Sequence, residues 1–113
     1  MSEELPLRDG SNFFGSLFTN LEKKEIAEKF AVQGWSARKA TWHDYEVLCE
    51  WAELIIEGNE PILFHGPIEN PDTNIDRILK TLRDAGIGYS GEYYDETGGL
   101  VMEYAWSPDP ASR

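Results

Sequence analysis

The chain contains a single cysteine, no long run of apolar residues and few basic residues. Because Cys49 has no second cysteine with which to form an intrachain disulfide, the composition favours a reducing compartment. No apolar run approaches the roughly 18 residues that a membrane-spanning helix needs. The acidic opening MSEELPLRDG lacks the apolar segment of a signal peptide. We therefore expect a cytoplasmic protein that is not inserted in a membrane.

Basic residues are outnumbered by acidic ones, which gives a formal net charge of −11, and they are absent from two long stretches. Residues 40–76 contain nine acidic residues and residues 84–112 contain six, and neither stretch contains Lys or Arg. Six of the ten basic residues lie instead in 23–29 and 77–83. A nucleic-acid backbone is bound by clustered Lys and Arg. The charge pattern therefore argues against direct nucleic-acid binding.

The remaining composition is that of a folded domain, with 41% hydrophobic residues and four Trp in 113 residues. Thr19 with Glu22, and Thr73 with Asp76, form the capping-box pattern that opens a helix. These two boxes predict helices over 19–33 and 73–86. Short apolar or alternating runs predict strands over 12–18, 35–42, 61–68, 88–95 and 99–106.

The segment YEVLCEWAELIIEG, residues 45–58, fits two structures. As a helix over 42–57 it would place its glutamates on one arc. As a strand over 45–57 it alternates apolar and acidic residues, with a change of phase near Ala52 that a β-bulge would produce. Periodicity alone does not decide between the two.

An internal repeat favours the strand. Residues 19–36 align with 73–90, with identical residues at five positions, and VLCEWA of 47–52 aligns with LVMEYA of the predicted C-terminal hairpin. We therefore predict that 45–57 is a strand paired with 35–42. The same alignment predicts that Trp51 and Tyr104 occupy matched buried positions in the two halves.

The predicted fold class is α+β, with a strand–helix–strand–strand unit present twice, at about 12–57 and 61–106, in one domain of residues 1–113. The two units form an antiparallel-rich sheet with both helices on one face, and residues 1–10 and 107–113 are loose tails. In topology alone this arrangement resembles the duplicated modules of gyrase-inhibitor-like and haem-binding SOUL-type domains, although no motif points to either family. A helix at 42–57 would instead give a ferredoxin-like fold with an inserted helix.

No motif of the sequence predicts an active site, a cofactor site or a metal site. GIGYSG, residues 86–91, resembles a dinucleotide fingerprint, but it follows a helix and precedes a strand, which is the reverse of the required order. Cys49 lies on the apolar phase of its strand and is expected to be an inert core thiol. Ser36 and Ser90 have no evident His–acid relay. The polar residues that could be assembled into a metal site match no ligand spacing; they are His43, Asp44, His65, Glu69 and Asp72.

Acidic residues of the two predicted hairpins share one phase and therefore one face of the sheet. Like charges side by side on a sheet lower its stability, so such a face is typical of a surface that binds a basic partner, with solubility as the alternative role. The residues predicted to bind the partner are Glu46, Glu50, Glu53, Glu57, Glu92 and Glu103.

We hypothesise a non-catalytic protein that binds a basic protein, as an inhibitor or immunity protein of a nucleic-acid enzyme would. The alternative is a small-molecule-binding domain in which aromatic and acidic side chains form a pocket for a cationic ligand. The aromatic residues on which that pocket depends also fit the hydrophobic core. Self-association is a further possibility that the sequence leaves open, and so are the identity of the partner or ligand and a role of the acids in solubility alone.

Overall fold

The protein is an α+β domain with a seven-stranded antiparallel sheet and two helices, seen in a computed structural model that describes residues 12–95 and 97–108. The predicted tail 1–10 and most of the tail 107–113 lie outside the described residues. In chain order the elements are β1 (Phe13–Phe18), α2 (Lys23–Val32), β2 (Ser36–Lys39), β3 (Tyr45–Cys49), β4 (Ala52–Gly58), β5 (Ile62–Gly66), α3 (Pro71–Asp84), β6 (Gly88–Tyr94) and β7 (Leu100–Trp106).

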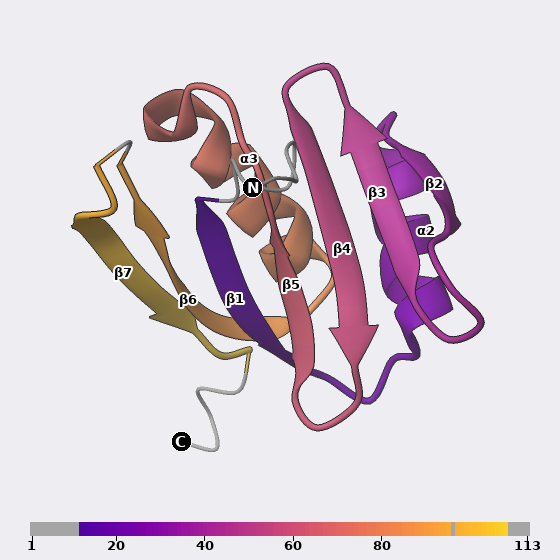
Figure 1. Ribbon diagram of the computed structural model, residues 1–113. Coiled ribbons are helices and arrows are strands. Elements are labelled where there is room, and N and C mark those ends of the chain that lie inside the picture. Colours follow the sequence, from indigo (N-terminus) through magenta and orange to yellow (C-terminus); the bar gives the residue numbers. More distant parts are fainter. Residues whose placement is uncertain (1–11, 96, 109–113) are drawn as a thin grey trace.

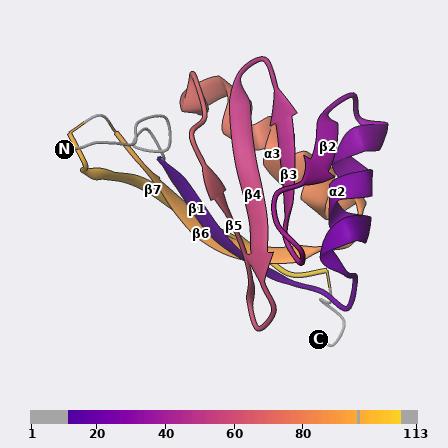
Figure 2. The same cartoon turned by 45° about the vertical axis from the view of Figure 1, so that its right-hand side comes forward.

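The strands lie in the order β2-β3-β4-β5-β1-β6-β7, and each neighbouring pair is antiparallel. Both helices pack behind the same face of this sheet (Figures 1 and 2). The predicted α+β class, the antiparallel sheet and the position of the helices are therefore confirmed. Within the described residues, neither helix is long and apolar enough to cross a bilayer.

Residues 45–58 form strands, as predicted, but they form two strands rather than one. β3 and β4 are joined by a turn at Glu50 and Trp51, and Cys49 pairs with Ala52 across it. Paired residues of an antiparallel hairpin point to the same face, so the change of phase near Ala52 is the mark of this turn and not of a bulge. The ferredoxin-like alternative, which needs a helix at 42–57, is wrong. The predicted pairing with the preceding strand is confirmed, since β2 pairs with β3 from Ser36–Leu48 to Lys39–Tyr45.

The two halves of the chain do not match at the register that the sequence repeat predicts. The first half has three strands after its helix and the second half has two. The two helices end alike, because Trp35 N–H bonds to the carbonyl of Phe30 just as Ile87 N–H bonds to that of Leu82. This places Gly34 opposite Gly86, whereas the sequence alignment places it opposite Gly88.

The prediction that Trp51 and Tyr104 occupy matched buried positions is wrong. Trp51 lies in the turn between β3 and β4, whereas Tyr104 lies in the middle of β7. Both side chains are half-buried and pack against the edge of the core. The sequence alignment placed a turn opposite a strand. VLCEWA runs from β3 through the turn into β4, whereas LVMEYA lies entirely within β7.

The helices begin at other residues than the predicted capping boxes. In α2 the capping box is formed by Glu22 and Glu25, and the Glu22 N–H donates to Oε1 of Glu25 at 2.8 Å. Thr19 instead accepts a hydrogen bond from the N–H of Leu21, which makes a turn before the helix. In α3 the helix begins at Pro71, whose fixed φ suits the first helical position.

The core lies between the helices and the inner face of the sheet. Phe13 of β1 packs edge-on against Phe64 of β5, with ring centroids 5.7 Å apart, and Phe30 of α2 contacts the same Phe64 at 5.4 Å. All three rings are at most 1% exposed. Burial of such side chains supplies most of the driving force for folding. The inward residues of α3 that complete the core are Ile75, Ile78, Leu79 and Leu82.

Gly66, at the end of β5, lies where two backbones approach closely, and we expect Gly66→Ala to destabilise the fold by about 3 kcal/mol or more. A Cβ atom at this position would overlap the backbone carbonyl oxygen of Glu53, so the backbone of β4 or β5 would have to shift. Chemical denaturation of the wild type and the variant measures the difference.

Gly86→Ala is the matched control for this prediction. Both glycines have a positive φ, 154° at Gly66 and 73° at Gly86. At Gly86, however, nothing lies within 4 Å of the place that an added methyl group would take. We expect this control to lose only about 1–2 kcal/mol, the cost of a left-handed conformation at a non-glycine residue. Equal losses in the two variants would mean that the backbones do not meet at Gly66.

Candidate functional site

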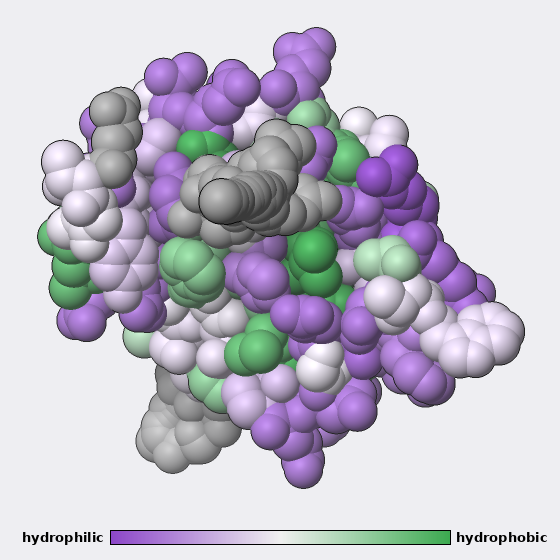
Figure 3. Space-filling model, in the orientation of Figure 1, coloured by the Kyte–Doolittle hydropathy of each residue, from purple (hydrophilic) through white to green (hydrophobic). Residues whose placement is uncertain are grey.

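The face of the sheet away from the helices, here called the outer face, carries a row of side chains that crosses all seven strands. The row follows from the registers of the strand pairs, because directly paired residues point to the same side. Figure 3 views the molecule from this side and shows hydrophobic residues interspersed among hydrophilic ones. From β2 to β7 the row is Arg38, Glu46, Ile55, His65, Phe14, Glu92 and Glu103.

Five of the six glutamates that the sequence singled out lie on this outer face. Glu46, Glu92 and Glu103 belong to the row itself, and Glu53 and Glu57 stand two residues on either side of Ile55 in β4. Glu50 does not join them, because it occupies the turn between β3 and β4. The glutamates within strands therefore share one face, as predicted, and only Glu50 in the turn does not.

Two of these glutamates have basic partners in space that the sequence does not reveal. Glu46 is only 5% exposed, and its Oε1 accepts a hydrogen bond from Nε of Arg38 at 2.9 Å. Glu57 Oε2 lies 2.7 Å from Nε2 of His65. The absence of Lys and Arg from residues 40–76 therefore does not mean that these glutamates lack basic partners in the folded protein. Glu46 holds β2 against β3 and is not available to a partner.

The acids of β6 and β7 lie directly opposite each other. Glu92 pairs with Glu103 across the ladder, an arrangement of like charges that lowers the stability of the sheet. Oε2 of Glu92 accepts a hydrogen bond from the hydroxyl of Tyr94 at 2.8 Å. This hydrogen bond to a carboxylate, together with burial and the two negative charges, raises the pKa of Tyr94 above its ordinary value.

Apolar side chains occupy the centre of the outer face. Phe14 and Phe18 of β1 are 39% and 53% exposed, and Leu63 of β5 is 40% exposed. Leu63 pairs with Ser16, which places it between the two phenylalanines. The ring of Phe14 also stacks on that of His65, with centroids 6.1 Å apart. Single exposed apolar residues are ordinary, but neighbouring ones on one face are typical of a surface that binds another molecule.

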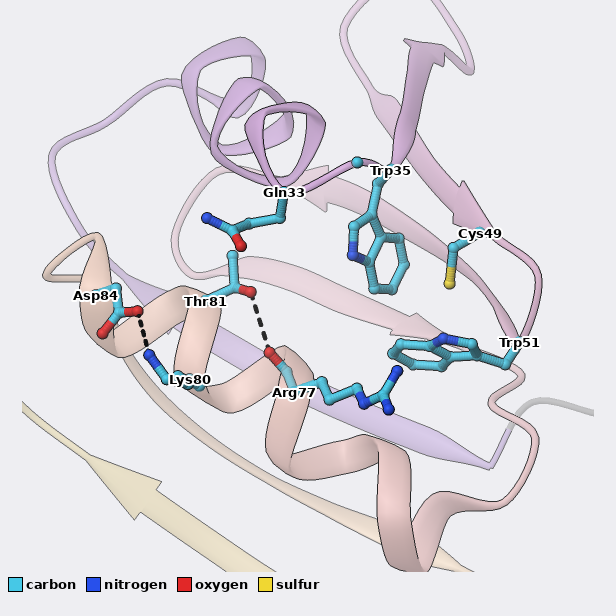
Figure 4. Close-up of a pocket in the computed structure, with 9 residues that line it drawn as sticks. Gln33, Trp35, Cys49, Trp51, Arg77, Lys80, Thr81 and Asp84 are labelled. Atoms are coloured by element: carbon cyan, nitrogen blue, oxygen red, sulfur yellow. Dashed lines mark hydrogen bonds and ion pairs between the residues drawn. The ribbon is translucent and has the colours of Figure 1, made fainter.

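A pocket of about 350 Å³ lies on the other side of the domain, between the end of α2, the exposed side of α3 and the turn that joins β3 to β4 (Figure 4). The indole rings of Trp35 and Trp51 meet edge to face there, with centroids 5.1 Å apart. The guanidinium of Arg77 lies over the ring of Trp51 at 5.8 Å. Hollows of about 520 and 390 Å³ flank the same turn.

Cys49 lines this pocket and is half-buried. Burial raises the pKa of its thiol above the ordinary value, so the thiol stays protonated at neutral pH. A protonated thiol is a poor nucleophile. Cys49 therefore packs against the edge of the core, with a thiol that is not activated as a nucleophile.

The polar residues considered for a metal site are held by different partners. Asp44 lies 3.4 Å from Nζ of Lys23, His65 contacts Glu57, and Asp72 accepts a hydrogen bond from the hydroxyl of Tyr93. Within residues 12–95 and 97–108, no group of three or more His, Cys, Asp or Glu is placed to hold a metal ion. Ser36 and Ser90 lie on the outer face of β2 and β6, and Ser90 pairs with Ser16 of β1.

Comparisons of the chain with protein-family models, with curated proteins and with solved structures find no match. No solved structure therefore supports the topological resemblance to gyrase-inhibitor-like and SOUL-type domains.

The sequence offered an aromatic pocket only as the alternative to burial of the same rings in the core, and it did not indicate that Arg77 borders one. The available signal was the turn itself. A Trp in a two-residue turn lies at the end of the hairpin, so its side chain does not enter the core from the inner face of the sheet as that of a strand residue does. The helix-borne Arg could not have been connected to it without the tertiary structure.

Replacing Glu92 tests the geometry of the acids on β6 and β7. We expect Glu92→Gln to lower the pKa of Tyr94 toward its ordinary value, because the substitution removes both the charged hydrogen-bond acceptor and the nearer negative charge. Glu103→Gln should lower it less, because Glu103 acts only through its charge. NMR titration of the Tyr94 ring carbon measures both. A larger effect from Glu103→Gln would contradict the hydrogen bond.

Proposed function

We propose that the outer face binds a basic, amphipathic segment of another protein, and that the domain performs no catalysis of its own. The observation that carries this proposal is the combination, on one sheet face, of four glutamates that are not buried, Glu53, Glu57, Glu92 and Glu103, with neighbouring exposed apolar side chains. An inhibitor or immunity protein would have such a surface, since the basic nucleic-acid site of an enzyme is complementary to it.

The arrangement of the face indicates the shape of the partner. Its apolar centre lies on β1 and β5, with Glu57 on β4 to one side and Glu92 and Glu103 on β6 and β7 to the other. Neighbouring strands lie about 4.8 Å apart, so β4 and β6 are separated by roughly 14 Å. An α-helix with its side chains is about 10–12 Å wide. A helix laid along β1 and β5 would therefore contact apolar residues beneath it and acids on both flanks.

The two kinds of side chain have different roles in this proposal. Burial of Phe14, Phe18 and Leu63 would supply most of the affinity, because apolar contacts in the centre of an interface dominate binding. The acids would orient the partner, accelerate its association and reject acidic competitors. Because Glu46 is buried against Arg38, the acids with this role are Glu53, Glu57, Glu92 and Glu103.

Charge reversal on both flanks tests the proposal. We expect the double variant Glu57→Lys with Glu103→Lys to bind a helical Lys/Leu peptide about tenfold more weakly or worse. The fold should be retained, because Lys at 103 would face Glu92 and replace a repulsion by an attraction. Calorimetric titration measures the affinity, and NMR spectra of the free and bound protein locate the peptide.

The matched control is Glu28→Lys with Asp76→Lys, which makes the same change in net charge on the exposed sides of α2 and α3. Its affinity for the peptide should stay close to that of the wild type. Equal losses in the two double variants would show that the peptide responds to net charge alone. The proposal would also be wrong if peptide-induced shifts fell on the helices, or if a second copy of the chain occupied the outer face in solution.

Removing an apolar contact tests the other half of the interface. Phe18 is more than half exposed, so Phe18→Ser should change the melting temperature little while weakening the same peptide severalfold. Val32→Ser is the control, because Val32 is 81% exposed on α2, away from the outer face. An unchanged peptide affinity in Phe18→Ser would leave charge as the only attraction and contradict an amphipathic partner.

A small-molecule ligand is the second candidate function, and the pocket beside Trp51 is the observation that favours it. The sequence suggested a cationic ligand in an acid-lined pocket. The lining instead contains Arg77 and Lys80 with a single acid, Asp84, which pairs with Lys80 at 2.8 Å. An anionic ligand fits this lining better than a cation does.

We also infer that the segments β1–α2–β2 and β5–α3–β6 arose by duplication, with the β3–β4 hairpin adding a strand to the first half. Support comes from the matching ends of the two helices, where Gly34 and Gly86 both have positive φ, of 101° and 73°. The test is to align the two halves of related sequences with Gly34 opposite Gly86. If the halves are no more similar than unrelated segments, the duplication is wrong.

A further inference from the structure

The pocket between α2, α3 and the β3–β4 turn is separate from the outer face, and its aromatic wall is held in place by the core. Trp35 packs edge-on against the fully buried Phe30, with centroids 5.1 Å apart, and Trp51 packs against Trp35. Both indoles are nevertheless partly exposed and line the hollow (Figure 4). A wall of this kind offers a planar ligand an apolar surface at little cost in side-chain entropy.

The opposite wall is provided by α3 and is basic. Arg77 and Lys80 are one turn apart on the exposed side of the helix, so both border the same hollow. Lys80 pairs with Asp84, whereas Arg77 lies within ion-pair distance of no carboxylate among residues 12–95 and 97–108. An arginine without an acid partner is a notable feature in a chain with a net charge of −11.

The position of Arg77 prepares it to bind an anion. Its guanidinium lies over the face of Trp51 at 5.8 Å, a contact that restricts the side chain without using its hydrogen-bond donors. Guanidinium donors match the two oxygens of a carboxylate. The amide of Gln33, at the end of α2, borders the same hollow and provides a further donor (Figure 4).

We propose that this pocket binds a small planar aromatic carboxylate, with its ring against Trp35 and Trp51 and its carboxylate on Arg77. The volume of about 350 Å³ lies at the lower end of the range for small-molecule sites, which fits a ligand of one or two rings. This site is independent of the proposed docking function, because none of the outer-face acids lines it.

Benzoate is the probe, and two analogues separate its parts: benzamide keeps the ring without the charge, and acetate keeps the charge without the ring. In NMR titrations of the wild type, benzoate should shift the indole N–H signals of Trp35 and Trp51. The indoles of Trp42 and Trp106 should not respond, since neither lines this pocket. Benzamide and acetate should each bind at least several times more weakly. Equal binding of either analogue, or equal shifts of all four indoles, would overturn the site.

Arg77→Gln should weaken benzoate binding about tenfold or more, since a charge-assisted hydrogen bond is lost. The substitution lies on an exposed helix position and should leave the melting temperature nearly unchanged. Lys24→Gln removes the same charge from α2, outside the pocket, and should keep the wild-type affinity. Equal affinities of the two variants would overturn the role of Arg77. Because neither residue touches the outer face, the peptide experiment is unaffected by either result.

Discussion

The pairing of β1 with β5 on one side and β6 on the other is the constraint on which the rest of the structure depends. Without β1 the sheet would separate into the four strands β2 to β5 and the hairpin of β6 and β7. Phe13 lies at the junction, packing on Phe64 of β5 and stacking on Tyr104 of β7. The pairing also needs Gly91, because a side chain there would overlap the backbone of β1. The outer face is continuous only because this junction aligns its two halves.

Much of the fold could be predicted from local pattern, and the failures occurred where the pattern has two physical causes. Alternation at 45–58 fitted a helix as well as a strand, so the strand was inferred from the sequence repeat. The turn was missed because a bulge and a tight turn both reverse the phase of the alternation. The turn residues, Glu50 and Trp51, are not the Gly or Asn that usually mark a two-residue hairpin turn. The start of α2 was displaced because its N-cap is Glu22, whereas Thr19 is of a residue type preferred at an N-cap and Glu is not.

The candidate sites differed in how far the sequence could predict them. The glutamates of the outer face were found because alternation within a strand needs only local information. The phase reverses at the turn, but the pairing of Cys49 with Ala52 keeps the glutamates of β3 and β4 on the same face. The partners Arg38 and His65 depend on strand register, which local pattern did not assign for these pairs. The pocket combines Trp35, Trp51 and Arg77, three residues from different elements that only the packing of α3 brings together.

The central place of β1 also has a consequence for how the protein is made. β1 is the first strand of the described chain to be synthesised, yet one of its two neighbours, β6, begins at residue 88. Before β5 is made, both edges of β1 expose unpaired backbone groups, and the edge that faces β6 stays unpaired until β6 is made. The apolar Phe13 and Leu17 are exposed with it. Contacts so distant in sequence form slowly, because the closure of a long loop precedes any gain from pairing. During translation the nascent chain therefore carries an unsatisfied strand for most of its length, the state in which chaperones recognise their clients.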